Sequence, residues 1–290
     1  MAKFMLSAFA DEASKSLEGQ IAALQRNGFP YLEPRDINGG ILTKTDEELT
    51  DIRKMLDDNG ISVYSLGSPI GKYKVHLPFQ PHWELFLRAL DVCHQLGTKY
   101  MRIFSFFTPQ ESLAEYRDVV LTRLQLMVQR AKADGITLCH ENESKIYGQN
   151  PAEVRDILDN VPGLMGIFDA SNFIMNDQDP MEGFEATKNL QYLHVKDAVG
   201  KYKTTIAVGH GDGRYAEILQ KVDASTDATV TLTLEPHLFG FKAFKEIDSH
   251  ELKTAVTYGS ADEAFDAAAT ALKTMLKSIG FHEEGKVWTK

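Results

Sequence analysis

The feature that most constrains the fold of this chain is a repeated alternation of short apolar runs and amphipathic segments. Each run has the length of a buried strand, and the segments between runs carry apolar residues three and four positions apart, as helices do. Eight strands are predicted, at Phe4–Phe9, Tyr31–Glu33, Ile61–Leu66, Tyr100–Phe104, Ile136–Glu143, Met165–Phe168, Tyr192–Val195 and Thr229–Leu234. A helix is expected after each strand.

Capping patterns mark the ends of several of these helices. Thr45 with Glu48 and Ser260 with Glu263 have the spacing of capping boxes, and Asn150-Pro151 is an N-cap followed by proline at the first helical position. The helical segment near Met181 to Lys188 is weaker than the others. Eight strand–helix units in 290 residues predict a parallel sheet with right-handed crossovers, closed into a (β/α)8 TIM barrel that forms one domain over residues 1–290. An open, doubly wound sheet is the alternative.

Composition narrows the class of partner. The formal net charge is -10, so the chain lacks the positive field that attracts nucleic acids and anionic membrane surfaces, and a small-molecule partner is expected. No run approaches the roughly 20 apolar residues of a membrane helix, and no signal peptide is recognisable at the N-terminus. Cys93 and Cys139 lie inside apolar segments, as free thiols do in a reducing compartment. We therefore expect a cytoplasmic protein.

Chemically active side chains stand at the ends of the last four predicted strands. These residues are Glu141, Asp169, His194 and Glu235. Taken singly, each acidic residue fits a solvent-facing carboxylate or a helix cap equally well, and His194 fits a hydrogen-bonded core histidine. The C-terminal ends of barrel strands form one mouth, however, so the four together predict a divalent-metal site. Their oxygen-rich set suits Mn²⁺, Mg²⁺ or Co²⁺, and the imidazole also admits Zn²⁺.

Four short motifs around these residues resemble the xylose isomerase-like barrel superfamily, and more narrowly its sugar phosphate isomerase/epimerase group. The motifs are His140-Glu141-Asn142, Phe168-Asp169-Ala170-Ser171-Asn172, His194-Val195-Lys196-Asp197 and Leu234-Glu235-Pro236-His237. The resemblance implies that Glu141, Asp169, His194 and Glu235 are metal ligands. It also implies that Glu141 and Glu235 act as acid and base on opposite faces of a substrate. None of the motifs is specific for one substrate.

Two positions depart from the ketose 3-epimerases of that group. Asn172 stands where a histidine is common, three residues after the aspartate, and Tyr147 replaces an acidic residue six positions after the first glutamate. We therefore expect a metal-dependent isomerase or epimerase of a small keto-sugar, polyol or hydroxy-carbonyl compound. An inosose-type dehydratase on the same scaffold is the first alternative. An endonuclease IV-like phosphodiesterase, which the acidic composition disfavours, and a non-catalytic sugar-binding barrel are the others.

Further residues are predicted to line the mouth. Substrate contacts are expected from Glu33, Arg35, Arg102, Lys196 and His237, and a salt-bridged polar layer inside the barrel is an equally good interpretation. Glu143 replaces Glu141 if the strand register shifts by two residues. The loop Gly209–Gly213 is interpreted as a flexible turn before a helix rather than as an anion site. The long segment 236–259, with Phe239, Phe241 and Phe244, is expected to form a lid or a contact between subunits of a homo-oligomer.

Overall fold

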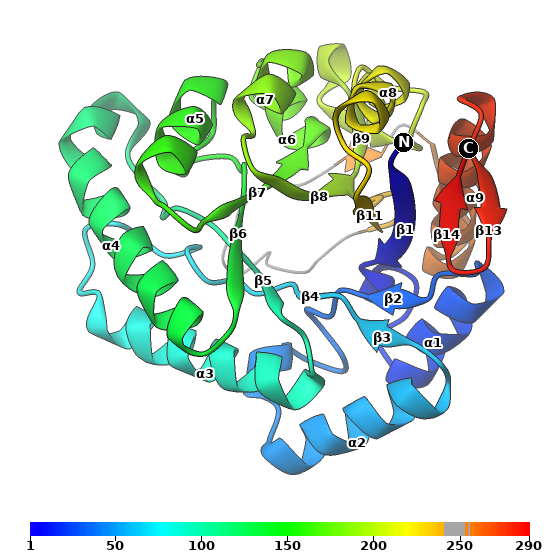
Figure 1. Ribbon diagram of the computed structural model, residues 1–290, viewed down its shortest axis with the longest axis horizontal. Coiled ribbons are helices and arrows are strands. Elements are labelled where there is room, and N and C mark those ends of the chain that lie inside the picture. Colours follow the sequence, from blue (N-terminus) through cyan, green and yellow to red (C-terminus); the bar gives the residue numbers. More distant parts are fainter. Residues whose placement is uncertain (241–252, 255) are drawn as a thin grey trace.

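A computed structural model describes residues 1–240, 253–254 and 256–290. In it, a ring of strands is surrounded by helices, and strands β1, β13 and β14 lie side by side (Figure 1). The strands of the ring are β1 (Lys3–Ala8), β2 (Tyr31–Leu32), β3 (Ser62–Val63), β4 (Ser65–Leu66), β5 (Tyr100–Ile103), β6 (Thr137–Glu141), β7 (Met165–Asp169), β8 (Leu190–Val195) and β11 (Thr229–Leu234).

The ring is parallel and nearly closed. Pairing runs from β4 through β5, β6, β7, β8 and β11 to β1, and then through β2 to β3. Strands β3 and β4 are the two halves of the single strand predicted at Ile61–Leu66, separated by Tyr64. The (β/α)8 TIM barrel predicted from the sequence is therefore confirmed.

Helices follow the strands as predicted. They are α1 (Leu17–Arg26), α2 (Asp46–Asp58), α3 (Gln80–Leu96), α4 (Leu113–Ala133), α5 (Pro151–Asn160), α6 (Ala170–Met175), α7 (Pro180–Ala186), α8 (Tyr215–Ser225) and α9 (Ala261–Ser278). The weak helix predicted near 181–188 is α7, and the additional α6 begins directly after β7 because the Asp169 side chain caps its first turn. Full capping boxes form at Thr45 and Asn150, and Ser260 caps α9.

Alternation along the strands divides the interior into two parts. Phe4 and Leu6 of β1 belong to the main apolar core, together with buried residues of the helices. A separate small cluster is formed by Cys139, Ile167 and Tyr192. These three come from neighbouring strands of the ring, and the alternation places them inside it.

Two small elements were not predicted. Strands β9 (Asp197–Val199), β10 (Thr204–Ile206) and β12 (Lys253–Thr254) form a three-stranded sheet, in which β10 pairs with both others. This sheet joins the segment after β8 to the segment after β11. The hairpin of β13 (His282–Glu284) and β14 (Val287–Thr289) follows α9, and β14 pairs antiparallel with β1.

The predicted lid segment 236–259 lies partly outside the described residues. Phe241 and Phe244 are among the residues outside them. Within it, β12 belongs to the three-stranded sheet and Phe239 is exposed. No helix in the described part of the chain combines the length and the apolar character needed to cross a membrane.

Candidate active site

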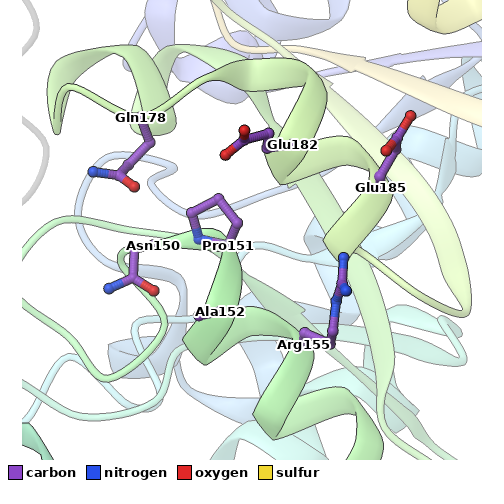
Figure 2. A pocket seen from close by; sticks show the side chains of 7 residues that line it. All are labelled: Asn150, Pro151, Ala152, Arg155, Gln178, Glu182 and Glu185. Atoms are coloured by element: carbon purple, nitrogen blue, oxygen red, sulfur yellow. The ribbon is translucent and has the colours of Figure 1, made fainter.

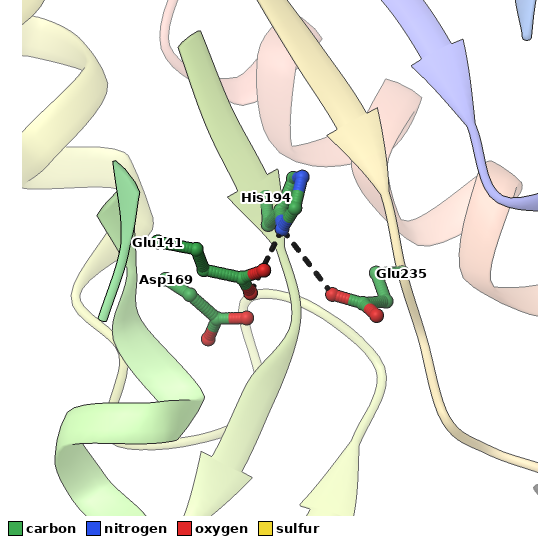
Figure 3. A group of neighbouring side chains, drawn as sticks. All are labelled: Glu141, Asp169, His194 and Glu235. Carbon is green, nitrogen blue, oxygen red and sulfur yellow. Dashed lines mark ion pairs between the residues drawn. The ribbon is translucent and has the colours of Figure 1, made fainter. Parts of the chain in front are cut away.

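Four side chains from consecutive strands of the ring converge at its C-terminal end (Figure 3). Glu141 and Asp169 are the last residues of β6 and β7, His194 is near the end of β8, and Glu235 follows β11. One potential ligand atom from each lies within 4.8 Å of the corresponding atoms of the other three, and all four side chains are buried. The convergence expected from the strand spacing is thus present in the structure.

The ends of β6 and β7 are joined by Asn142, which follows Glu141. Its amide nitrogen donates to the carbonyl of Asp169 at 2.9 Å, and its amide oxygen accepts from the Asp169 backbone N–H at 3.0 Å. These two hydrogen bonds fix the position of Glu141, at the end of β6, relative to Asp169, at the end of β7. It gives the Asn of the His-Glu-Asn motif a structural role beside the ligand residue.

His194 lies at the centre of the cluster. Its Nδ1 is 2.9 Å from Oε1 of Glu141 and 3.4 Å from Oε2 of Glu235. Burial alone would lower the pKa of His194, but the carboxylates of Glu141 and Glu33 raise it to about 10. In the metal-free protein the imidazole therefore carries a proton on each nitrogen at neutral pH.

An arginine holds each of the two glutamates. Nη1 of Arg102 is 3.3 Å from Oε2 of Glu141, and Nη1 of Arg35 is 2.5 Å from Oε1 of Glu235. Burial would raise the pKa of Glu141, yet His194 and Arg102 lower it to about 2. Burial likewise opposes ionisation of Glu235, but Lys196 and other cations keep its pKa well below the usual value. Both glutamates are therefore ionised at neutral pH.

Lys196 contacts the other acidic side of the cluster. Its Nζ is 2.9 Å from Oδ2 of Asp169 and 3.5 Å from Oε2 of Glu235. Burial raises the pKa of Asp169 to about 7 despite the lysine. Among the three carboxyl groups of the cluster, Asp169 is thus the weakest acid and the one most easily protonated.

The donor atoms fit a divalent cation. Oδ2 of Asp169, Oε2 of Glu235 and both ring nitrogens of His194 are buried, and in the described part of the chain they make ion pairs at 2.9–3.5 Å but no well-aligned hydrogen bond. Buried polar atoms without hydrogen bonds are costly, and a cation coordinated by three carboxylates and an imidazole would satisfy them. Oxygen-rich sets with one histidine suit Mn²⁺, Mg²⁺, Co²⁺ or Zn²⁺.

All the residues predicted to line the mouth lie at or next to the cluster, but most are committed to ion pairs. Arg35 also contacts Asp11 and Glu12, at 3.0 and 2.9 Å. His237 donates its backbone N–H to Glu12, and its Nε2 is 3.5 Å from Glu235. The salt-bridged polar layer considered from the sequence is therefore present. Substrate contacts by these residues stay a prediction.

The structure shows where two features with alternative interpretations lie, namely Glu143 and the loop Gly209–Gly213. Glu143 lies 2.9 Å from Nζ of Lys72, outside the four-residue cluster, so Glu141 is the residue that joins it. The loop Gly209–Gly213 does bind an anion through its amides, but the anion is the carboxylate of Asp197. The interpretation of this loop as a flexible turn missed that internal partner.

Sequence reasoning assigned no role to Phe9, Glu12 or Tyr192. The ring of Phe9 lies 5.0 Å from that of His194 and beneath both Arg35 and Arg102. Tyr192 precedes His194 by two residues and so faces the same side of β8. Glu12 follows the end of β1. The other acidic residues were predicted because they stand at strand ends, and the same criterion would have predicted a role for Glu12.

A cavity lies on the outer wall of the barrel, between α5 and α7 (Figure 2). Its volume is about 590 Å³, and its lining consists of Asn150, Pro151, Ala152, Arg155, Gln178, Glu182 and Glu185. None of the four cluster residues lines it, so the buried chemistry of the molecule lies elsewhere.

Comparisons with known proteins agree with this fold. The sequence matches the family described as xylose isomerase-like TIM barrel over residues 21–253. No curated protein matches it.

Three solved structures show the same fold. An L-ribulose 3-epimerase is 15% identical, with a TM-score of 0.74 and coverage of 96% of each chain. A probable 3-DHS dehydratase involved in petrobactin synthesis in Bacillus anthracis is 14% identical, with a TM-score of 0.71 and coverage of 94% of this chain and 98% of that one. A xylose isomerase-like TIM barrel/4-hydroxyphenylpyruvate dioxygenase fusion protein is 16% identical, with a TM-score of 0.70. The match covers 96% of this chain but only 44% of the fusion protein.

Proposed function

This chain belongs to the xylose isomerase-like TIM barrel family, and from that premise we propose that it is a divalent-metal-dependent isomerase or epimerase. Its substrate would be a small keto-sugar, polyol or related hydroxy-carbonyl compound. The structural neighbours include sugar 3-epimerases, which supports the broad class, although identities of 12–18% do not identify a substrate.

One observation carries the proposal: two buried, ionised glutamates lie on either side of the Nδ1 atom of His194. Glu141 and Glu235 both lie within 3.4 Å of Nδ1 of that ring, from opposite sides of the cluster (Figure 3). A carboxylate within hydrogen-bond reach of a carbon acid can remove its proton, and a second one can return it. When bound, a divalent cation would stabilise the negative charge that develops on a substrate oxygen during that step.

The surrounding cations suit this work. His194 and Arg102 keep Glu141 ionised. Lys196, together with Arg35, keeps Glu235 ionised, so each glutamate can accept a proton at neutral pH. Lys196 would approach a developing oxyanion from the side of Asp169. The site is enclosed by buried side chains, and a low-dielectric site strengthens these electrostatic effects.

The two departures from the ketose 3-epimerase pattern have structural counterparts. The Tyr147 hydroxyl donates to Asp156 of α5 at 2.6 Å, and the Asn172 amide donates to the carbonyl of Asn142 at 2.8 Å. Neither position supplies the acidic or imidazole group of those epimerases. This observation favours an inosose-type dehydratase as the second candidate, in which loss of a β-hydroxyl follows the same proton abstraction.

Solvent exchange tests the proposal. Keto-sugars and inososes would be screened with Mn²⁺ in D₂O, and deuterium at the substrate α-carbon would be followed by NMR. We expect Glu141→Gln and Glu235→Gln each to lower the exchange rate by at least about 100-fold, because general acid–base catalysis contributes about 10²–10⁴-fold. Product analysis would separate isomerisation from dehydration.

Glu143→Gln is the matched control, because Glu143 is two residues from Glu141 but pairs with Lys72 outside the cluster. This variant should keep its exchange rate. Full exchange in Glu141→Gln or Glu235→Gln would show that the substituted residue is not an obligatory proton carrier. Exchange with none of the substrates, together with no metal binding, would support a sugar-binding barrel instead.

A further inference from the structure

Both ring nitrogens of His194 face carboxylates. Nδ1 points into the cluster formed with Glu141 and Glu235, whereas Nε2 lies 3.4 Å from Oε2 of Glu33 on the opposite side of the ring. The imidazole is thus placed between the candidate metal site, with its three carboxylates, and a fourth carboxylate that does not belong to it.

Glu33 is enclosed rather than open to the mouth. It follows β2, its exposed fraction is 0%, and its Oε1 accepts a hydrogen bond from the Tyr192 hydroxyl at 2.8 Å. The Tyr192 hydroxyl in turn lies 3.0 Å from the hydroxyl of Ser65 in β4. These contacts fix the carboxylate from below and direct its second oxygen at His194, which is a poor position for a group that contacts substrate.

Aromatic rings fix the plane of the imidazole. The rings of Phe9 and Tyr192 meet it edge to face, with centroids at 5.0 and 5.3 Å. All three side chains have an exposed fraction of 0%. Rotation of the imidazole that would exchange its two nitrogens is therefore opposed by packing against these two rings.

We propose that Glu33 is a positioning residue that accepts the Nε2–H of His194 and so presents the Nδ1 lone pair to the metal. The inference rests on the proposed function, since it concerns the same metal site. A neutral imidazole has one N–H and one lone pair, and the hydrogen bond made by one nitrogen decides which nitrogen can bind a cation. A buried carboxylate at Nε2 selects the tautomer whose lone pair is on Nδ1.

Tyr192 and Ser65 complete this arrangement. A carboxylate buried without partners is costly, and the Tyr192 hydroxyl supplies a donor that leaves the other oxygen of Glu33 for His194. Glu33, which the sequence predicted to bind substrate, acts through His194 in this assignment.

Metal titration of purified variants tests the pairing without any substrate. Binding of Mn²⁺ and Zn²⁺ would be measured by isothermal titration calorimetry on metal-free wild type and Glu33→Gln. Loss of a carboxylate behind a ligating histidine weakens metal binding about 10–100-fold, and we expect Glu33→Gln to fall in that range. Tyr192→Phe should weaken binding less, because Glu33 keeps its charge.

A spectroscopic measurement separates positioning from general destabilisation. In wild type loaded with Zn²⁺, long-range ¹H–¹⁵N correlation of labelled histidines should show His194 ligated through Nδ1 with a proton on Nε2. Glu143→Gln is the control for removal of a nearby carboxylate and should match wild type in affinity and spectrum.

The outcomes are distinguishable. Wild-type affinity in Glu33→Gln, or ligation of His194 through Nε2, would overturn the pairing while leaving the proposed function intact. Failure of the wild type to bind either metal would overturn both.

Discussion

At the scale of single residues, the candidate site is a set of charges that hold one another in place. His194, Asp169 and Lys196 contact carboxylates or an ammonium group at about 3 Å, and none of them is exposed to solvent beyond a few per cent. Cation binding must therefore displace protons as well as fill a space, since metal ligands bind in their deprotonated forms.

The pKa values of His194 and Asp169 predict how metal affinity depends on pH. With a pKa of about 10, His194 is protonated in the metal-free protein at neutral pH and must lose that proton to bind a cation. With a pKa of about 7, Asp169 adds a second proton below neutrality. The logarithm of the affinity should rise by about one per pH unit between the two pKa values, and by up to about two below the lower one.

Calorimetric titration with Mn²⁺ in buffers of different ionisation enthalpy would count the released protons directly. About one proton should be released at pH 8, and more at pH 6. An affinity that does not change with pH over this range would contradict the assignment of His194 as a cationic residue in the metal-free protein.

The same residues show how much of the candidate site could be predicted from the sequence. Glu141, Asp169, His194 and Glu235 could be predicted because each stands at a strand end, and all strand ends of a parallel barrel meet at one mouth. The buried position of Glu33, beneath the mouth of the barrel, could not be predicted from the sequence. Whether a residue after a strand points into the mouth or beneath a neighbour depends on strand stagger, which distant pairings such as that of β1 with β11 determine.

At the scale of elements, the segment after β8 is organised by Asp197. One carboxylate oxygen accepts from the backbone N–H groups of Ala198 and Gly213, and the other accepts from those of Gly209 and Gly211. A Cβ atom at Gly211 or Gly213 would lie only 2.4 or 2.6 Å from the nearer oxygen of Asp197. Gly211 and Gly213 are therefore required by the close approach of the carboxylate.

Asp197→Asn should loosen this loop. The amide group would turn its NH₂ toward backbone donors, leaving two of them without an acceptor. We expect faster hydrogen exchange at Gly209, Gly211 and Gly213 and a loss of about 1–3 kcal/mol in the free energy of unfolding, the cost of unsatisfied buried groups.

Hydrogen exchange with peptide-level mass spectrometry and urea unfolding would measure the two effects. Asp212→Asn is the control, because Asp212 lies in the same loop, is exposed and accepts only from Gly200 among the contacts described. Unchanged exchange in Asp197→Asn would show that the loop is held by other contacts.

Prediction of elements succeeded where the information is local. The caps at Thr45, Asn150 and Ser260 are confirmed because each lies within three residues of its partner. It failed for β9, β10 and β12, which have two or three residues each and owe their existence to partners far along the chain. Such short segments carry no periodicity of their own.

At the scale of the whole molecule, the C-terminal hairpin completes the wall of the barrel. Strand β2 pairs with the C-terminal half of β1, and β14 pairs with its N-terminal half through Phe4 and Trp288. Trp288 is only 2% exposed, and Phe281 packs on Phe4 with ring centroids 4.8 Å apart. The hairpin therefore covers apolar surface at the end of the barrel away from the candidate site.

Trp288→Ala should lower the free energy of unfolding by about 3–5 kcal/mol, as expected for removal of a large buried aromatic side chain. Trp288→Phe, which keeps a ring in place, should cost less. Because the hairpin and the four-residue cluster lie at opposite ends of β1, metal affinity should stay at the wild-type value in both variants. Urea unfolding and calorimetric titration would measure these quantities, and a stability loss below about 1 kcal/mol in Trp288→Ala would show that the hairpin is peripheral.

The pairing of β1 also determines when its two edges can become paired during protein synthesis. Its long neighbour β11 and its short neighbour β14 are both translated near the end of the chain, and Asp223 of α8 binds the backbone of Ala2 and the side chain of Lys290. Strand β1 therefore leaves the ribosome well before these partners, and one of its edges stays unpaired until they have been made. Contacts of such high sequence separation form late and slow the search for the native state. An exposed strand edge during that wait is a surface that chaperones recognise and that aggregation exploits.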